Sequence, residues 1–142
     1  MATQISVFVE NKPGKIEAIT DILFQGGINL RGISIASRGD FGILKILPDN
    51  PGKAAGLLEG SGATISRRAV VIALIDDRPG SLHELLKVLR KNSINIDDCY
   101  GISVEQDKQA AIVLDIEDNP KTESILRAAG VRLIEDKDIH TL

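Results

Sequence analysis

Two four-residue turns carry the residue types that could bind a small charged molecule. They are Asn11-Lys12-Pro13-Gly14 and Asp77-Arg78-Pro79-Gly80. Each turn follows a segment with the alternating apolar pattern of a β-strand and precedes one with the apolar spacing of an amphipathic helix. Proline fixes φ where a helix can begin, and glycine lets the backbone approach another group closely. The free N–H groups of such a helix N-terminus suit a carboxylate or a phosphate. The alternative is that each Pro-Gly pair only makes a tight turn.

The elements that must position the first turn follow the order βαββαβ. We predict strands at residues 4–10, 28–36, 41–47 and 63–66, a first helix at residues 14–25, and a short second helix after Asp49-Asn50-Pro51. The pair Gly26-Gly27 ends the first helix because glycine tolerates a left-handed backbone. The Asp-Asn-Pro sequence places capping residues just before a proline, which is a helix start signal.

The same order then begins again. We predict strands at residues 69–75, 110–116 and 131–134, an extended stretch at 94–104, a polar turn at 106–109, a helix at 81–91, a second helix after Asp118-Asn119-Pro120, and a short edge segment at 135–142. Asn11 and Asp77 are 66 positions apart (77 − 11), as are Asn29 and Asn95 (95 − 29). These aligned landmarks indicate an internal duplication.

The duplication divides the chain into two predicted domains, residues 1–68 and 69–142, joined by the short charged sequence Ser66-Arg67-Arg68. Pro51 and Pro120 are 69 positions apart, which predicts three extra residues in the second copy. We expect these residues around Asp97-Asp98-Cys99, where a bulge or a longer strand end could absorb them.

A βαββαβ unit of this size forms a four-stranded antiparallel sheet with both helices on one face, so the predicted fold class is α+β. The strands at residues 70–75 and 110–114 are apolar on both faces. Such strands are normally covered on both sides. Either the two copies cover each other or a second chain does, and we predict a homodimer or a larger homo-oligomer.

Composition excludes several classes of partner. The net charge of −3, the pI near 5.4 and the aromatic content of 3% argue against binding to nucleic acid. No apolar run is long enough to span a bilayer, and no signal peptide is visible at the N-terminus. We expect a cytoplasmic protein without a membrane partner. The single cysteine, Cys99, is expected to be a small buried apolar residue.

The two Pro-Gly turns, the sequence Gly27-Ile28-Asn29-Leu30 and the duplication together resemble the ACT domain family. The resemblance covers nearly the whole chain, once in each copy. It implies two tandem ferredoxin-like βαββαβ domains that bind small regulatory ligands, most often amino acids. In this family the ligand lies between the strand-to-helix loop of one domain and the second strand of its neighbour.

The resemblance also implies a set of site residues. Asn11, Gly14 and Asn29 match the ligand-contacting positions of the family, and Asp77, Gly80 and Asn95 stand at the same positions in the second copy. The full set of candidate ligand-binding residues is Asn11, Lys12, Pro13, Gly14, Asn29, Leu30, Asp77, Arg78, Pro79, Gly80, Asn95 and Ile96. Serine-responding members carry a histidine where this chain has Val9 and Ile75, which argues against serine.

The residues themselves support an amino acid ligand and leave alternatives open. A carboxylate could lie on the amides at Gly14 or Gly80, and an ammonium on the side-chain oxygen of Asn29 or Asn95. Both asparagines could instead hydrogen-bond only their own backbone. We predict no catalytic residue, no metal site and no cofactor, hence a non-catalytic regulatory protein. The alternatives are an adaptor subunit without a ligand, or a small ferredoxin-like enzyme such as an acylphosphatase.

Overall fold

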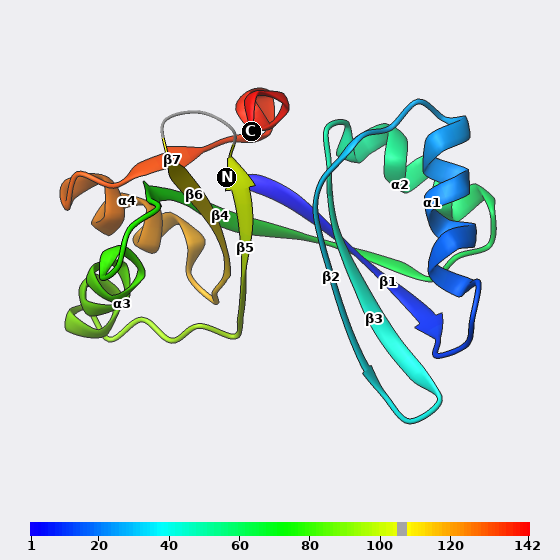
Figure 1. Cartoon of the computed structure of the whole chain (residues 1–142), viewed down its shortest axis with the longest axis horizontal. Coiled ribbons are helices and arrows are strands. Elements are labelled where there is room, and N and C mark those ends of the chain that lie inside the picture. The colour runs from blue at the N-terminus through cyan, green and yellow to red at the C-terminus, as the bar shows by residue number, and fades with distance from the viewer. Residues whose placement is uncertain (105–107) are drawn as a thin grey trace. The chain divides into compact units, whose positions relative to one another are not determined.

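A computed structural model describes residues 1–104 and 108–142, which form two compact units (Figure 1). The N-terminal unit is Thr3–Arg68, and the C-terminal unit is Ala69–Leu142 together with Met1 and Ala2. The elements are β1 (Ala2–Glu10), α1 (Lys15–Gln25), β2 (Leu30–Arg38), β3 (Phe41–Pro48), α2 (Pro51–Gly60), β4 (Ile65–Asp76), α3 (Ser81–Lys91), β5 (Asp98–Val104), β6 (Gln109–Asp115), α4 (Asn119–Ala128), β7 (Arg132–Ile134) and the 3-10 helix η1 (Asp136–Thr141).

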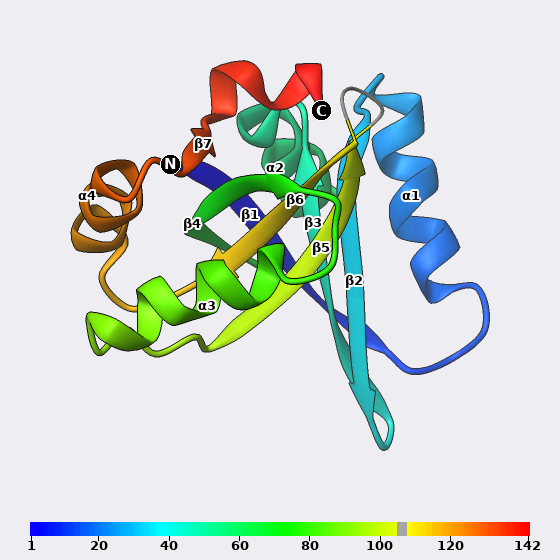
Figure 2. The same ribbon diagram turned by 60° about the vertical axis from the view of Figure 1, so that its left-hand side comes forward.

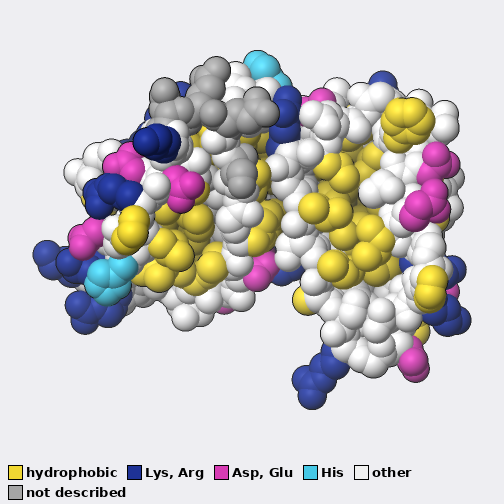
Figure 3. Space-filling model, in the orientation of Figure 1, with side chains coloured by type: hydrophobic (Ala, Val, Ile, Leu, Met, Phe, Trp, Pro, Cys, Tyr) yellow, Lys and Arg dark blue, Asp and Glu magenta, His cyan; other side chains and the backbone are white. Residues whose placement is uncertain are grey.

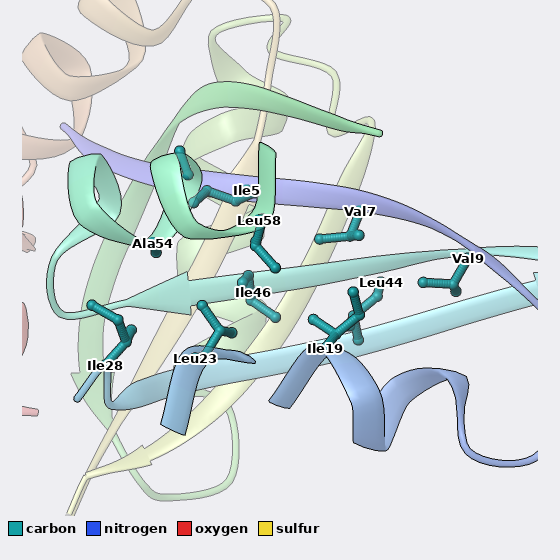
Figure 4. Close-up of a cluster of buried hydrophobic side chains, with 11 residues drawn as sticks. Ile5, Val7, Val9, Ile19, Leu23, Ile28, Leu44, Ile46, Ala54 and Leu58 are labelled. Atoms are coloured by element: carbon teal, nitrogen blue, oxygen red, sulfur yellow. The ribbon is translucent and has the colours of Figure 1, made fainter. Parts of the chain in front are cut away.

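In the N-terminal unit the strands lie in the order β2-β3-β1 and pair antiparallel. β4 begins beside β1, where the Phe8 N–H donates to the Thr64 carbonyl at 3.0 Å. Alternate residues of β1 and β3 point toward α1 and α2 and form the core that Figure 4 shows between helices and sheet. Its buried members are Ile5, Val7, Val9, Ile19, Leu23, Ile28, Leu44, Ile46, Ala54, Ala55 and Leu58.

The C-terminal unit repeats this arrangement with the strand order β5-β6-β4-β7, again antiparallel. Figures 1 and 2 show α3 and α4 on one face of this sheet. The buried core residues between them are Val71, Ala73, Leu85, Leu89, Ile112, Leu114, Ile116, Leu126 and Leu133. The predicted α+β class, with two ferredoxin-like βαββαβ units and their helices on one face of each sheet, is therefore confirmed.

The predicted interruption of the strand at the junction of the two copies is wrong. We expected separate strands at residues 63–66 and 69–75 with a charged connection between them, but β4 is one uninterrupted strand from Ile65 to Asp76. No glycine, proline or asparagine lies within β4 to stop the strand. Arg67 and Arg68 are exposed, and an exposed charged side chain is compatible with extended backbone.

The strands that are apolar on both faces are buried on both faces within a single chain. Val70, Val71, Ile72 and Ala73 of β4 are all fully buried. These residues therefore need no second chain to cover them.

The C-terminal tail was predicted to add an edge segment, and this prediction is wrong. Residues Asp136–Thr141 form the 3-10 helix η1, whose Ile139 is fully buried. Leu74 lies on the face of β4 opposite the helices, because its neighbours Ala73 and Ile75 point to the helix side. A cavity of about 240 Å³ between Leu74 and residues Asp138 and Thr141 places η1 over that face.

The register of the duplication changes by two residues, not three. Val7 pairs with Leu44 and, 66 positions later, Ala73 pairs with Ile112, which is 68 positions after Leu44. The caps of the second helices agree with this offset. Asn50 accepts a hydrogen bond from the Lys53 N–H at 3.1 Å, and Asp118 accepts one from the Lys121 N–H at 3.0 Å. Pro51 therefore corresponds to Asn119 and not to Pro120.

The extra residues lie in the second hairpin and not around Asp97-Asp98-Cys99, where we predicted them. Arg38 pairs with Phe41 and leaves two residues between the strands, whereas Val104 pairs with Gln109 and leaves four. A hairpin loop absorbs insertions without shifting the core register of the strands. Of the predicted polar turn at 106–109, residues 106 and 107 lie outside the described residues.

Cys99 is exposed, contrary to the prediction that it is buried. It pairs with Leu114 of the core, but β5 is the outermost strand of its sheet. Side chains of an outer strand lie beyond the cover of the helices even when they point to the helix side.

The turn after the first helix provides a test of the duplication. Gly27 has φ of 67°, and Ser93, 66 positions later, has φ of 55°. A left-handed backbone is unfavourable for serine and free of steric cost for glycine. We expect Ser93→Gly to raise the free energy of unfolding by about 0.5–1 kcal/mol and Gly27→Ser to lower it by about 1 kcal/mol. Urea unfolding measures both changes in the free energy of unfolding, provided that the m-value stays the same. A destabilising effect of Ser93→Gly would contradict the predicted steric cost of serine at this position.

The pH dependence of stability provides a second test. Partial burial of Tyr100 on β5, followed by the nearby carboxylates of Asp98 and Asp115, raises the pKa of Tyr100 above its ordinary value. In the unfolded chain the tyrosine ionises near pH 10, before it ionises in the folded protein. The contribution of this group to the free energy of unfolding is therefore fully present below pH 10. Above pH 10 it falls by about 1.4 kcal/mol per pH unit. Urea midpoints between pH 8 and 11 should fall more steeply for the wild type than for Tyr100→Phe. Parallel curves would contradict the prediction.

Candidate functional site

Both predicted turns have the same backbone conformation. Gly14 has φ of 84° and Gly80 has φ of 93°, and each is the N-cap of the helix that follows. Only glycine takes this left-handed conformation without steric cost. The turn therefore redirects the chain from a strand into a helix at a residue that has no side chain to cap that helix.

The first turns of α1 and α3 consequently offer N–H groups. In α1 the Lys15 N–H donates to the Lys12 carbonyl at 3.3 Å and the Ala18 N–H to the Gly14 carbonyl at 3.0 Å. The N–H groups of Ile16 and Glu17 between them have no intrahelical acceptor, and no side chain caps α1 or α3 in the described part of the chain. The second helices differ, because Asn50 and Asp118 cap α2 and α4.

The basic residues of the two turns pair with the acid that ends the preceding strand. Lys12 Nζ lies 2.9 Å from Glu10 Oε2 and Lys15 Nζ 3.4 Å from Glu10 Oε1. Arg78 Nε lies 3.4 Å from Asp76 Oδ2 in the second unit. The Lys12 ammonium, assisted by Lys15, lowers the pKa of Glu10, and Glu10 in turn raises the pKa of Lys12. These pairs are exposed, so they orient the turns more than they stabilise them.

Asn11 ties the first turn to the hairpin between β2 and β3. Its side-chain Nδ2 donates to the Gly39 carbonyl at 2.9 Å, and its backbone N–H donates to the Asp40 carbonyl at 2.8 Å. In the second unit the Asp77 N–H donates to the Lys108 carbonyl, but a carboxylate cannot repeat the side-chain bond. The end of β2 therefore lies beside the Pro-Gly turn of the same unit.

Asn29 and Asn95 lie before β2 and β5 and are exposed. The Asn29 N–H donates to Asp49 Oδ1 at 3.2 Å and its carbonyl accepts from the Asp49 N–H at 3.0 Å, so its backbone is fixed while its side chain faces outward. Asn95 Nδ2 donates to Asp97 Oδ1 at 3.3 Å. Asn95 therefore makes a local hydrogen bond, but to a neighbouring side chain and not to its own backbone.

The two halves of the predicted site do not meet within one unit. Gly14 and Asn29 lie at opposite ends of α1, whose 11 residues span about 16 Å. Gly80 and Asn95 are separated by α3 in the same way. Leu30 and Ile96, predicted to face a ligand side chain, are half-buried and pack against the core of their own unit.

Each unit has a groove beside its first helix that sequence reasoning missed. In the N-terminal unit the groove holds about 510 Å³ and is lined by Phe8, Glu10, Lys15, Ile22, Phe41 and Ala63, among others. In the C-terminal unit it holds about 350 Å³ and is lined by Asp76, Arg78, Ser81, Glu84, Val88 and Val131, among others. Arg78 is the one predicted site residue in these linings. The lining residues of each groove are far apart in the sequence, so no sequence motif could have predicted the groove.

The outer edge of the N-terminal sheet carries exposed apolar side chains. Within residues 1–104 and 108–142, β2 is the outermost strand of its sheet and pairs only with β3. Ile33 and Ile35 of β2 are 52% and 42% exposed, although their partners Ile46 and Leu44 are buried. Figure 3 shows hydrophobic side chains gathered on this face of the N-terminal unit. At the corresponding positions the C-terminal unit has the smaller residues Cys99 and Gly101.

In residues 1–104 and 108–142, no group of three or more histidine, cysteine, aspartate or glutamate side chains is arranged to hold a metal ion. None of the described helices has the length and apolar content that crossing a bilayer requires.

Comparison with known proteins agrees with this geometry. A family model described as an ACT domain pair matches residues 1–142. The chain is similar to the crystal structure of protein BT0572 from Bacteroides thetaiotaomicron, with 29% identity, a TM-score of 0.93, and coverage of 99% of this chain and 96% of that one. A comparison with curated proteins found no match.

Two further solved structures share the fold. The regulatory subunit of aspartate kinase from Thermus thermophilus, in its ligand-free form, is 17% identical with a TM-score of 0.65, and the regulatory subunit from Thermus flavus is 16% identical with a TM-score of 0.62. Each alignment covers 90% of both chains. Since the family model spans all of the sequence and both units have the βαββαβ order, this chain belongs to the ACT domain family as a pair of ACT domains.

Proposed function

We propose that this protein is a non-catalytic regulatory protein that binds an amino acid between two ACT domains of a homodimer. The ligand lies between the Pro-Gly turn of one domain and the Asn29 side chain of the domain beside it. The regulatory character of the family supports the general role, and the geometry of the N-terminal unit supports the site.

The hydrogen bonds of Asn11 are the observation that carries the proposal. They hold the end of β2 next to the Pro-Gly turn, while Asn29 immediately precedes the start of β2. If two β2 strands pair antiparallel across a two-fold axis, the end of one strand lies beside the start of the other. The turn of one protomer then lies beside Asn29 of its partner, so that both halves of the site meet.

The exposed edge favours this pairing. An outer strand presents unpaired N–H and C=O groups, and Ile33 and Ile35 add apolar surface that a partner strand would cover. Of the two units, the N-terminal one has the larger apolar side chains at its edge, because Cys99 and Gly101 replace these isoleucines in the other.

The proposed site matches a zwitterion. The N–H groups of Ile16 and Glu17 and the positive end of the α1 dipole suit a carboxylate. The side-chain oxygen of Asn29 suits an ammonium, since the amide oxygen accepts two hydrogen bonds. In the second unit Asp77 replaces Asn11, so a ligand there meets an acceptor-only group and the two sites are not equivalent.

A thermal-shift screen of the twenty amino acids tests the function. A ligand that binds only the folded dimer adds about 2.7 kcal/mol at a hundredfold excess over Kd, which corresponds to a Tm increase of several degrees. Asn29→Ala should weaken the ligand by about tenfold to a hundredfold, the equivalent of about 1–3 kcal/mol, with little change in the Tm of the ligand-free protein. Gln25→Ala, an exposed change on the same unit, is the control.

The alternatives give different results in the same experiment. A confirmed dimer without any Tm shift would support an adaptor that has no ligand. Equal affinity of Asn29→Ala and wild type would remove Asn29 from the site. Turnover of an acyl phosphate that persists when Gly14 and Gly80 are both changed to alanine would support an enzyme at a different site.

The dimer interface is tested separately. Ile33→Lys should convert the dimer to a monomer, because it places a charge in an apolar contact and on a strand edge. Phe8→Lys is the matched control, since Phe8 is exposed to a similar degree but lies on the other face of the sheet, stacked on Phe41 at 5.0 Å. Light scattering coupled to size-exclusion chromatography measures the mass. A dimer that survives Ile33→Lys and dissociates in Phe8→Lys would place the interface on the opposite face.

A further inference from the structure

The C-terminal unit contains a polar cavity of about 210 Å³ that lies within one domain. Its walls come from the segment that leads into β5 and from the start of α4, which Figures 1 and 2 both show at the same edge of this unit. The polar lining residues are Ser93, Asn95, Asp97, Glu117, Asp118, Lys121 and Thr122. A volume of this size holds about seven water-sized groups, which is enough for a small organic molecule.

The charge of the lining selects a cation. Among the described lining residues, Asp97, Glu117 and Asp118 carry carboxylates, and Lys121 carries an ammonium. One oxygen of Asp97 accepts from Asn95 Nδ2 at 3.3 Å, and one oxygen of Asp118 accepts from the Lys121 N–H at 3.0 Å. Each carboxylate has two oxygens and about four acceptor positions, so one hydrogen bond does not saturate it.

Thr122 provides independent evidence for a ligand. It lies in the first turns of α4, lines the cavity and is 0% exposed, yet its Oγ1 has no hydrogen-bond partner among the described residues. A buried hydroxyl without a partner is unfavourable, because it has lost its hydrogen bonds to water and gained none in return. A bound molecule that donates a hydrogen bond to this oxygen would remove that cost.

The duplicated unit shows that the fold does not require these residues. With the offsets of 66 and 68 positions, Asp97 corresponds to Arg31 and Thr122 to Ala54. Ala54 is equally buried and is part of the apolar core. The second unit therefore carries a hydroxyl and an opposite charge at places where the same fold uses a methyl group and a cation.

From these observations we propose that the C-terminal unit binds a small organic cation with a primary ammonium group in this cavity. The ammonium donates hydrogen bonds to Asp97, Glu117 and the Thr122 hydroxyl. A metal ion is a poorer match, because these carboxylates are not arranged as a metal cluster in the described structure. The site goes beyond the amino acid site between domains, and Asn95 is the one residue that belongs to both proposals.

Titration of the full-length protein with 1,4-diaminobutane, followed by backbone-amide NMR, tests the proposal. We expect saturable shifts confined to residues 93–97 and 117–122. Tetramethylammonium at equal ionic strength, which has the charge but no N–H donor, should not produce them. Thr122→Val and Asp97→Asn should each weaken the amine by about tenfold or more. Glu84→Gln, which removes an exposed carboxylate outside the cavity, should leave the affinity unchanged.

Three results would overturn the proposal. They are the absence of saturable shifts in the wild type, equal shifts with tetramethylammonium, and unchanged affinity in both Thr122→Val and Asp97→Asn. The wild-type titration decides the matter even if a variant does not fold. Asn29→Ala should bind the amine as the wild type does, so failure of the amino acid site and failure of this site are distinguishable.

Discussion

The left-handed backbone of Gly14 and Gly80 is the constraint on which the arrangement of both units depends. It turns each first strand directly into a helix, and a residue with a side chain would take that conformation only at a steric cost. Since glycine has no capping oxygen, the first turns of α1 and α3 keep free N–H groups, whereas Asn50 and Asp118 occupy those of α2 and α4. In each unit, the N-terminus of the first helix therefore has no side-chain cap among the described residues, whereas the N-terminus of the second helix has one.

The position of these open termini determines what a site requires. Within a unit, α1 separates Gly14 from Asn29 by its full length, so one domain supplies either an anion site or an amide acceptor but not both at one place. Asn11 places the uncapped helix terminus beside the end of β2, which is the outermost strand among the described residues of its sheet. Under the proposed function, a ligand that contacts both groups binds only the assembled state and shifts the equilibrium toward it.

The duplication has kept the fold and changed the surfaces. The N-terminal unit has Ile33 and Ile35 at its outer edge, whereas the C-terminal unit has Cys99 and Gly101 there. Beside α4, the C-terminal unit has Asp97 and Thr122 where the N-terminal unit has Arg31 and Ala54. Since the two units have equivalent cores, these differences are not needed for folding, and they are consistent with a division of roles between the two domains.

The sequence determined the local structure. Apolar periodicity, the Pro-Gly turns and the Asp-Asn-Pro caps predicted the βαββαβ order of both copies, because these signals act within a few residues of the backbone that they shape. Tertiary structure decided what depends on distant partners. The pairing of β4 with β6 and the cap at Asp118 set the offset of 68, which the proline alignment missed by one residue, and the cover over Leu74 made the tail a helix and not a strand. The grooves, the exposed edge of β2 and the polar cavity at Thr122 were likewise visible only in three dimensions, since residues far apart in the chain meet there.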